Sequence, residues 1–171
     1  MVYAPVFDTL WFGYMEEDNG IKKAFKTIDA SQKIRRFDIA EQKLLTRKPL
    51  ENVKVITSRF YSSRIIGNWL KKNLGIKKYI HLTRGSSLKF CLISEGLAHL
   101  YPRQGVTCIW DTVASHAILN CSGGSVISLT NGSDLVYNQN LENPEFLASC
   151  WNTREISLLI KNQKKYLSTD F

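Results

Sequence analysis

The sequence predicts an α/β fold in which helices cover both faces of one sheet, and two patterns carry that prediction. Between Val53 and residue 124, strand-like and helix-like segments alternate along the chain, which is typical of α/β layering. The helix expected over residues 62–75 has a single apolar face, and such a face must be covered by a sheet or by another helix.

The N-terminal part of the chain predicts strands and loops. Residues 2–15 are rich in aromatic and β-branched residues and are broken by Pro5 and Asp8, a pattern that indicates two strands joined by a turn. Because a strand-like run starts so close to Met1, we expect the sheet to continue upstream of it. Residues 18–52 are polar and weakly periodic, so loops and short edge strands are expected there.

The first strand and helix of the alternating region have clear boundaries. Residues 53–58 alternate as a buried strand does, and residues 62–75 follow as a helix. Ser62 or Ser63 is the expected cap, and Gly75 ends the helix. Five apolar side chains are expected on its inward face: Ile65, Ile66, Trp69, Leu70 and Leu74.

The following segments continue the alternation. The predicted order is strand 77–82, helix 86–96, strand 97–103, helix 111–124 and two strand-like runs, 125–129 and 134–137. A polar tail with little pattern ends the chain. In folds of this kind, ligands approach where strand ends meet helix starts.

The composition narrows the function classes. The formal net charge of +8 favours an anionic partner, but the lysines and arginines form small scattered groups, which are more typical of a solvated surface than of specific nucleic-acid binding. The four cysteines show no CxxC pair and no zinc-type spacing with histidine. No apolar run reaches the roughly 20 residues that span a bilayer, so we expect no transmembrane segment and a cytoplasmic location.

Two short segments carry candidate site residues at expected helix starts. Asp111 follows Trp110 and precedes an apolar-periodic helix, so its carboxylate is expected at the N-cap. Gly85, Ser86 and Ser87 also precede a helix, and they either cap it or bind an anion there.

Two cations lie close to these segments in the sequence. Lys89 falls one turn into the helix after the glycine-serine turn, and Arg103 ends a predicted strand. Each either supplies charge to a phosphate or lies on the solvated surface. His116 has no visible base or ligand partner in the sequence and is expected to serve packing.

A block of the chain resembles a known family. The segment GSSLKFCLISEGLAHLYPRQGVTCIWDTVASHAILNCSGG, residues 85–124, resembles the bisphosphate nucleotidase branch of the inositol monophosphatase superfamily, in which GSSLK, AEG-x-A-x-LYPR, WDTAA-x-HA-x-L and GG recur in this order. The upstream VYAP, GIKKAFK and ITSR extend the resemblance over most of residues 1–124.

The resemblance implies a domain organisation. Residues 53–171 would form the αβα layered C-terminal domain of the inositol monophosphatase-like (carbohydrate phosphatase) fold. Residues 1–52 would be remnant strands of a truncated N-terminal α+β domain.

The resemblance also implies roles for the candidate residues. Asp111 would be a Mg²⁺ ligand, which suits a hard carboxylate. The implied substrate contacts are Gly85, Ser86, Ser87, Lys89 and Arg103. Inositol-specific relatives place an acidic residue at the position of Gln104, so its absence favours a nucleotide over inositol.

Most of the family's metal site is missing from the sequence. Relatives draw the other Mg²⁺ ligands from a glutamate on an early helix and from a D-P-x-D-G-T segment, and the 171 residues contain no D-P-x-D-G-T. The family's SRSH motif is altered at Phe60 and Tyr61. Other acidic residues show no ligand spacing: Glu16, Glu17, Asp18 and Asp38. No complete catalytic set is therefore expected, and Mg²⁺ would bind weakly without an N-terminal half.

These observations lead to one preferred function and to alternatives. The resemblance implies the C-terminal part of a Mg²⁺-dependent 3'(2'),5'-bisphosphate nucleotidase, which converts 3'-phosphoadenosine 5'-phosphate to AMP and phosphate and is inactive alone. A complementing N-terminal half or a homo-oligomer would be its partner. The alternative is a non-catalytic remnant or interaction module of a split gene, with an exposed sheet edge. An inositol-phosphate phosphatase is less favoured.

Overall fold

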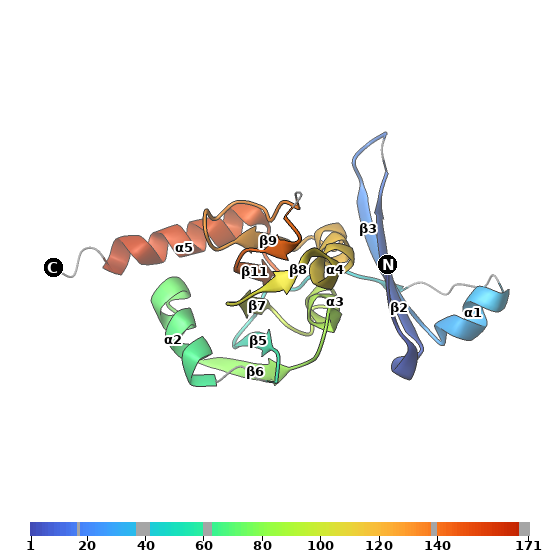
Figure 1. Cartoon of the computed structure of the whole chain (residues 1–171), viewed down its shortest axis with the longest axis horizontal. Helices are drawn as coiled ribbons and strands as arrows, with labels where there is room; N and C mark the ends of the chain where they lie inside the picture. The colour runs from blue at the N-terminus through green and yellow to red at the C-terminus, as the bar shows by residue number, and fades with distance from the viewer. Residues whose placement is uncertain (17, 37–41, 60–62, 138–139, 168–171) are drawn as a thin grey trace.

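The computed structural model describes residues 1–16, 18–36, 42–59, 63–137 and 140–167. Its layers are visible in Figure 1: two helices, a five-stranded sheet, two more helices, and a smaller sheet beyond them. Phe60, Tyr61 and Ser62 lie outside the described residues, as do Glu17 and Asp38.

The five-stranded sheet, called the main sheet below, has the order β6-β5-β7-β11-β9. β5 runs parallel to β6 and β7, whereas β11 runs antiparallel to β7 and β9. Its strands are β5 (Val53–Thr57), β6 (Tyr79–Thr83), β7 (Leu100–Arg103), β9 (Ser125–Ser128) and β11 (Phe146–Ser149). The predicted α/β class is confirmed.

Helices cover both faces of the main sheet, each with its own apolar core. The helices are α2 (Ser63–Leu74) and α5 (Thr153–Leu167) on one face, and α3 (Leu88–Ser94) and α4 (Ile109–Cys121) on the other. On α2, Ile66 and Leu70 are fully buried, but Ile65 is 56% exposed. The inward position predicted for Ile65 is wrong, because one residue of helix rotates it about 100° away from Ile66.

The small sheet pairs four antiparallel strands in the order β1-β2-β3-β4. These are β1 (Val2–Ala4), β2 (Thr9–Met15), β3 (Lys22–Ile28) and β4 (Gln42–Lys43). The turn between β1 and β2 is a 3-10 helix, η1 (Pro5–Phe7). One face packs on α4, where a Cβ added at Gly13 would lie 3.0 Å from Cys121 Cβ. The two strands predicted over residues 2–15 are therefore present.

Two expectations about irregular segments are wrong, and a third holds only in part. Residues 18–52 contain the expected short edge strand, β4, but also β3, which pairs on both sides, and the helix α1 (Ala30–Arg36). Residues 134–137 form no strand, and Asp134 makes only an isolated bridge to Ile127. The tail contains β11, which lies inside the main sheet, and the long helix α5.

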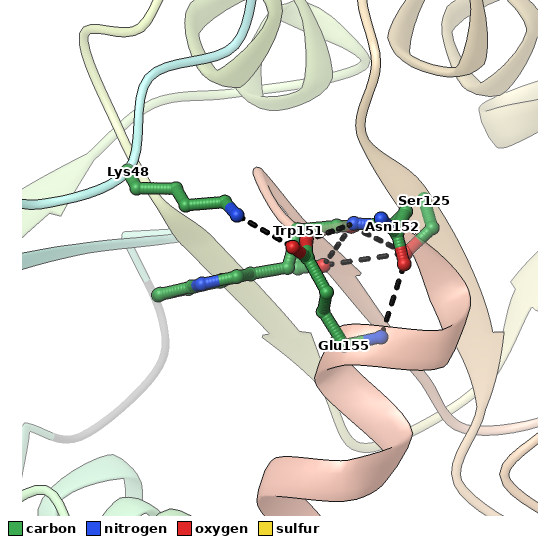
Figure 2. Close-up of polar contacts among 6 residues, drawn as sticks. Lys48, Ser125, Trp151, Asn152 and Glu155 are labelled. Atoms are coloured by element: carbon green, nitrogen blue, oxygen red, sulfur yellow. Dashed lines mark hydrogen bonds and ion pairs between the residues drawn. The ribbon is translucent and has the colours of Figure 1, made fainter.

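The start of α5 is tied to the segment that links the two sheets (Figure 2). Asn152 Oδ1 accepts a hydrogen bond from the Glu155 N–H at 3.0 Å, and Glu155 Oε2 accepts one from the Asn152 N–H at 3.3 Å. Lys48 Nζ, from the linking segment, lies 2.5 Å from Glu155 Oε1. The Ser125 hydroxyl donates to the Trp151 carbonyl at 2.8 Å. These contacts satisfy polar groups at the helix start.

The domain boundary at residue 52 and the cytoplasmic location stay predictions. Within the described ranges, no helix is both long enough and apolar enough to cross a membrane.

Candidate functional site

One cavity of about 220 Å³ gathers most of the candidate residues, and we call it the anion cavity. It lies where the ends of β5 and β7, the turn before α3 and the start of α4 meet. Five of its lining residues were singled out from the sequence: Ser86, Ser87, Lys89, Arg103 and Asp111. Gly85 is exposed and does not line it.

Asp111 stands in the first turn of α4, not at its cap. The helix starts two residues earlier than predicted, with Cys108 as the N-cap. Asp111 Oδ2 accepts a hydrogen bond from the Cys108 N–H at 2.9 Å, so the carboxylate satisfies a backbone donor from the third helical position. The side chain is exposed at the anion cavity.

Lys89 is buried, which excludes the solvated-surface alternative. Its side chain is 4% exposed, and Nζ donates to the Ser86 carbonyl at 2.7 Å. Nζ also lies 4.7 Å from the centre of the Tyr101 ring, a favourable cation–π contact. Burial, reinforced by the charge of Arg103 and opposed by that of Asp111, lowers the pKa of Lys89 to about 8.

The turn before α3 holds an unusual backbone conformation. Ser86 has φ +54°, in the left-handed region, which is uncommon for residues other than glycine. The Ser86 and Ser87 hydroxyls lie 3.4 Å apart. Because Lys89 Nζ bonds the Ser86 carbonyl, the buried ammonium stabilises this turn from inside the chain.

Arg103 brings a second cation to the anion cavity. It ends β7, and its Nη2 donates to the Val106 carbonyl at 3.0 Å. Lys89 and Arg103 thus face the cavity together with a single carboxylate, Asp111. The excess of positive charge suits an anion, and a guanidinium can bind a phosphate through two parallel hydrogen bonds.

A buried hydrogen-bond network begins at Thr112 in the cavity wall and was not predicted from the sequence. Thr112 is 2% exposed, and its Oγ1 donates to the Ile109 carbonyl at 3.2 Å. The same oxygen accepts from Asn143 Nδ2 and from the Tyr137 hydroxyl, each at 3.1 Å. Asn143 precedes Pro144 in a polar stretch, a pattern that is typical of a loop. The sequence therefore gave no reason to select Asn143 as a site residue.

The network continues to His116, which is 6% exposed. Its Nδ1 lies 2.9 Å from the Tyr137 hydroxyl, and its Nε2 lies 3.1 Å from Asn120 Nδ2. Since an amide nitrogen only donates, Nε2 accepts and Nδ1 carries the hydrogen. Burial lowers the pKa of His116 to about 4, so the imidazole is neutral near pH 7. The expected packing role of His116 agrees with this placement.

The residues at the cavity do not by themselves suit a magnesium ion. Among the described residues, no group of three or more histidines, cysteines, aspartates or glutamates is placed to hold a metal. Magnesium requires an octahedral set of oxygen ligands, and Asp111 supplies one carboxylate. Other ligands would have to come from elsewhere.

Comparison with known proteins matches the resemblance found in the sequence. Residues 1–167 match the inositol monophosphatase family. The protein named 3'(2'),5'-bisphosphate nucleotidase CysQ from Buchnera aphidicola is 39% identical over 138 residues, which cover 78% of this chain and 43% of the relative. The protein of the same name from Escherichia coli K12 is 33% identical over 130 residues, 74% of this chain and 44% of the relative. The chain therefore spans less than half the length of these relatives.

Solved structures agree on the fold. The crystal structure of CysQ from Bacteroides thetaiotaomicron, a bacterial member of the inositol monophosphatase family, superposes with a TM-score of 0.65 at 25% identity and covers 86% of this chain and 55% of that one. Mycobacterium tuberculosis SuhB gives a TM-score of 0.52 at 16% identity, over 82% of this chain and 50% of that one. The predicted inositol monophosphatase-like fold is confirmed.

Proposed function

The chain belongs to the inositol monophosphatase family, and from that premise we propose that it is the C-terminal, substrate-holding part of a 3'(2'),5'-bisphosphate nucleotidase. The proposed substrate is 3'-phosphoadenosine 5'-phosphate, and the products are AMP and phosphate. One observation carries the proposal: Lys89, Arg103 and Asp111 face the same small cavity. The names of the relatives that match most of this chain support the nucleotide as substrate.

In this proposal the two cations hold a phosphate group of the substrate. Arg103 supplies a planar guanidinium, and Lys89 supplies a charge that is already desolvated before the ligand arrives. Ser86 and Ser87 offer hydroxyls at the same cavity. Gly85 has no side chain and does not line the cavity, so its proposed substrate contact is through backbone atoms alone.

Asp111 is proposed as one of several Mg²⁺ ligands. The remaining carboxylates would come from a complementing N-terminal half, and the described residues alone do not suit the ion. Magnesium ions in such a site would activate water and neutralise the leaving oxygen. This chain alone is accordingly proposed to bind the nucleotide without hydrolysing it.

A second candidate function is a non-catalytic interaction module. It is favoured by β1, which forms an edge of the small sheet, and an unpaired strand edge can accept a strand from another chain. An N-terminal half or a second copy of this chain would both suit that edge.

Phosphate release tests the catalytic proposal. The full chain is incubated with Mg²⁺ and 3'-phosphoadenosine 5'-phosphate, alone and mixed with the N-terminal half of the Buchnera relative. We expect no release by the chain alone and measurable release by the mixture. Release by the chain alone would contradict the proposed need for further ligands, and an inactive mixture that nevertheless forms a complex would favour the non-catalytic module.

A further inference from the structure

We propose that Asn143 is a positioning residue that holds the Asp111 carboxylate at the anion cavity, an inference that rests on the role proposed above for Asp111. Asn143 lies on β10 (Glu142–Asn143), which pairs with β8 (Thr107–Cys108). It is more than thirty positions away from Asp111 in the sequence and does not line the anion cavity.

The side-chain amide of Asn143 bonds three groups around the start of α4. Its Nδ2 donates to the Cys108 carbonyl at 2.8 Å and to the hydroxyls of Thr107 and Thr112, each at 3.1 Å. Two N–H groups serve three acceptors, so one hydrogen is shared. Asn143 is 7% exposed, and a buried amide with this many partners resists displacement.

Cys108 connects Asn143 to Asp111. Its carbonyl accepts from Asn143 Nδ2 at 2.8 Å, and its N–H donates to Asp111 Oδ2 at 2.9 Å. The peptide groups on the two sides of one residue are therefore fixed by two different side chains. If the Cys108 carbonyl were released, the N–H that orients the carboxylate would lose its fixed position.

Thr112 provides a second link from the same amide to the first turn of α4. Its hydroxyl accepts from Asn143 and Tyr137 and donates to the Ile109 carbonyl. This uses the single donor and both acceptor sites of the hydroxyl. Asn143 thus bonds both Cys108, the N-cap of α4, and Thr112, the residue that follows Asp111 in the sequence.

The chemistry at this position requires a donor. The Cys108 carbonyl can only accept, and the Thr112 hydroxyl already donates its hydrogen to the Ile109 carbonyl. Asn143→Asp keeps the size of the side chain but directs a carboxylate oxygen at those acceptors, and Asn143→Leu leaves them buried without a partner. Asn143→Ser keeps one donor on a shorter side chain, so its effect should be intermediate.

Amide hydrogen exchange in the full chain tests the positioning directly. The Cys108 N–H reports on the bond to Asp111, and the Cys150 N–H, which donates to the His99 carbonyl at 2.9 Å, reports on the main sheet. We expect Asn143→Asp and Asn143→Leu to raise the exchange rate of the Cys108 N–H by about tenfold or more, and Asn143→Ser to raise it by a smaller factor. The exchange rate of the Cys150 N–H should change by less than about twofold in all three variants. Asn73→Asp is the matched control, because it also removes an amide that donates to a backbone carbonyl, that of Trp69 at 2.9 Å, but it lies on α2 and should leave Cys108 unchanged.

A kinetic measurement adds a second readout in the mixture with the complementing N-terminal half. Asn143→Asp should lower kcat by about tenfold or more with little change in KM, since the nucleotide contacts stay in place. Unchanged exchange at Cys108, or an equal rise at Cys108 and Cys150, would overturn the proposal. If the mixture shows no activity for any variant, the proposed enzymatic function fails, while the exchange data still decide the role of Asn143.

Discussion

The anion cavity and the small sheet are packed very differently. Beneath the cavity, Phe90 and Tyr101 meet edge to face with ring centres 5.4 Å apart, and Phe90 is 1% exposed. At the small sheet, Val6 is 91% exposed, Phe7 59% and Tyr14 45%. The chain completes the core of the first region by itself, whereas the second buries one face on α4 and leaves large apolar side chains in water.

This difference in packing suggests separate roles for the two regions in the proposed function. The part that would hold the nucleotide rests on a continuous buried core beneath the cavity, although Val106 and Trp110 beside the cavity are exposed, and this core lets it keep its shape alone. The part with exposed apolar groups has the character of a surface that receives another chain. Three perturbations sharpen the comparison.

The largest effect is expected from added methyl groups in the main-sheet region. A Cβ at Gly124 would lie 2.5 Å from both the Ser149 carbonyl oxygen and Leu119 Cδ1, so Gly124→Ala should cost about 3 kcal/mol of unfolding free energy. At the small sheet, a Cβ at Gly13 would lie 3.0 Å from Cys121 Cβ, and Gly13→Ala should cost about 1 kcal/mol. Urea unfolding measures both, and equal costs would argue against a tighter main-sheet region.

Acidification is expected to have a smaller effect on the unfolding free energy, and His116 is the group responsible. Its pKa is lowered from 6.5 to about 4 mainly by burial, with Asp134 opposing the shift and Lys22 adding to it. The unfolded chain therefore binds more protons between these values, so stability present above pH 6.5 is lost as the pH falls towards 4. From pH 7 to pH 5 the loss should be about 2 kcal/mol.

His116→Gln is the control for this pH effect. The variant lacks the titrating group. Urea unfolding at each pH should therefore show that the difference in unfolding free energy between wild type and variant shrinks by a similar amount from pH 7 to pH 5. A constant difference would show that folding does not lower the pKa of His116.

The smallest effect concerns the contact that joins the two regions. Glu95, just after α3, accepts from Lys26 Nζ and Trp11 Nε1 of the small sheet, each at 2.7 Å. Glu95→Gln keeps the shape of the side chain but removes its charge. Because the ion pair is partly buried, the variant should lose about 1 kcal/mol of unfolding free energy. Amide exchange should rise in β2 and β3 and stay unchanged in β7. A uniform rise would mean that the two regions unfold as one unit.

The sequence predicted the elements that have strong local signals. The apolar spacing of α2 and the glycine at its end, Gly75 with φ +67°, both act within a few residues, and the motifs around Asp111 are contiguous. β11 was missed because its four residues, Phe146–Ser149, are buried on both faces, which removes the alternation that marks a strand. Asn143 was missed because its partners are distant in sequence and only the fold brings them together.

The central claim is that this chain contains the phosphate-holding part of a nucleotidase site, and calorimetric titration with 3'-phosphoadenosine 5'-phosphate tests it most directly. The full chain should bind the nucleotide, and Arg103→Gln should weaken binding by about tenfold or more, while the exposed Lys78→Met leaves it unchanged. No binding by the wild type, or equal losses in the two variants, would contradict the claim.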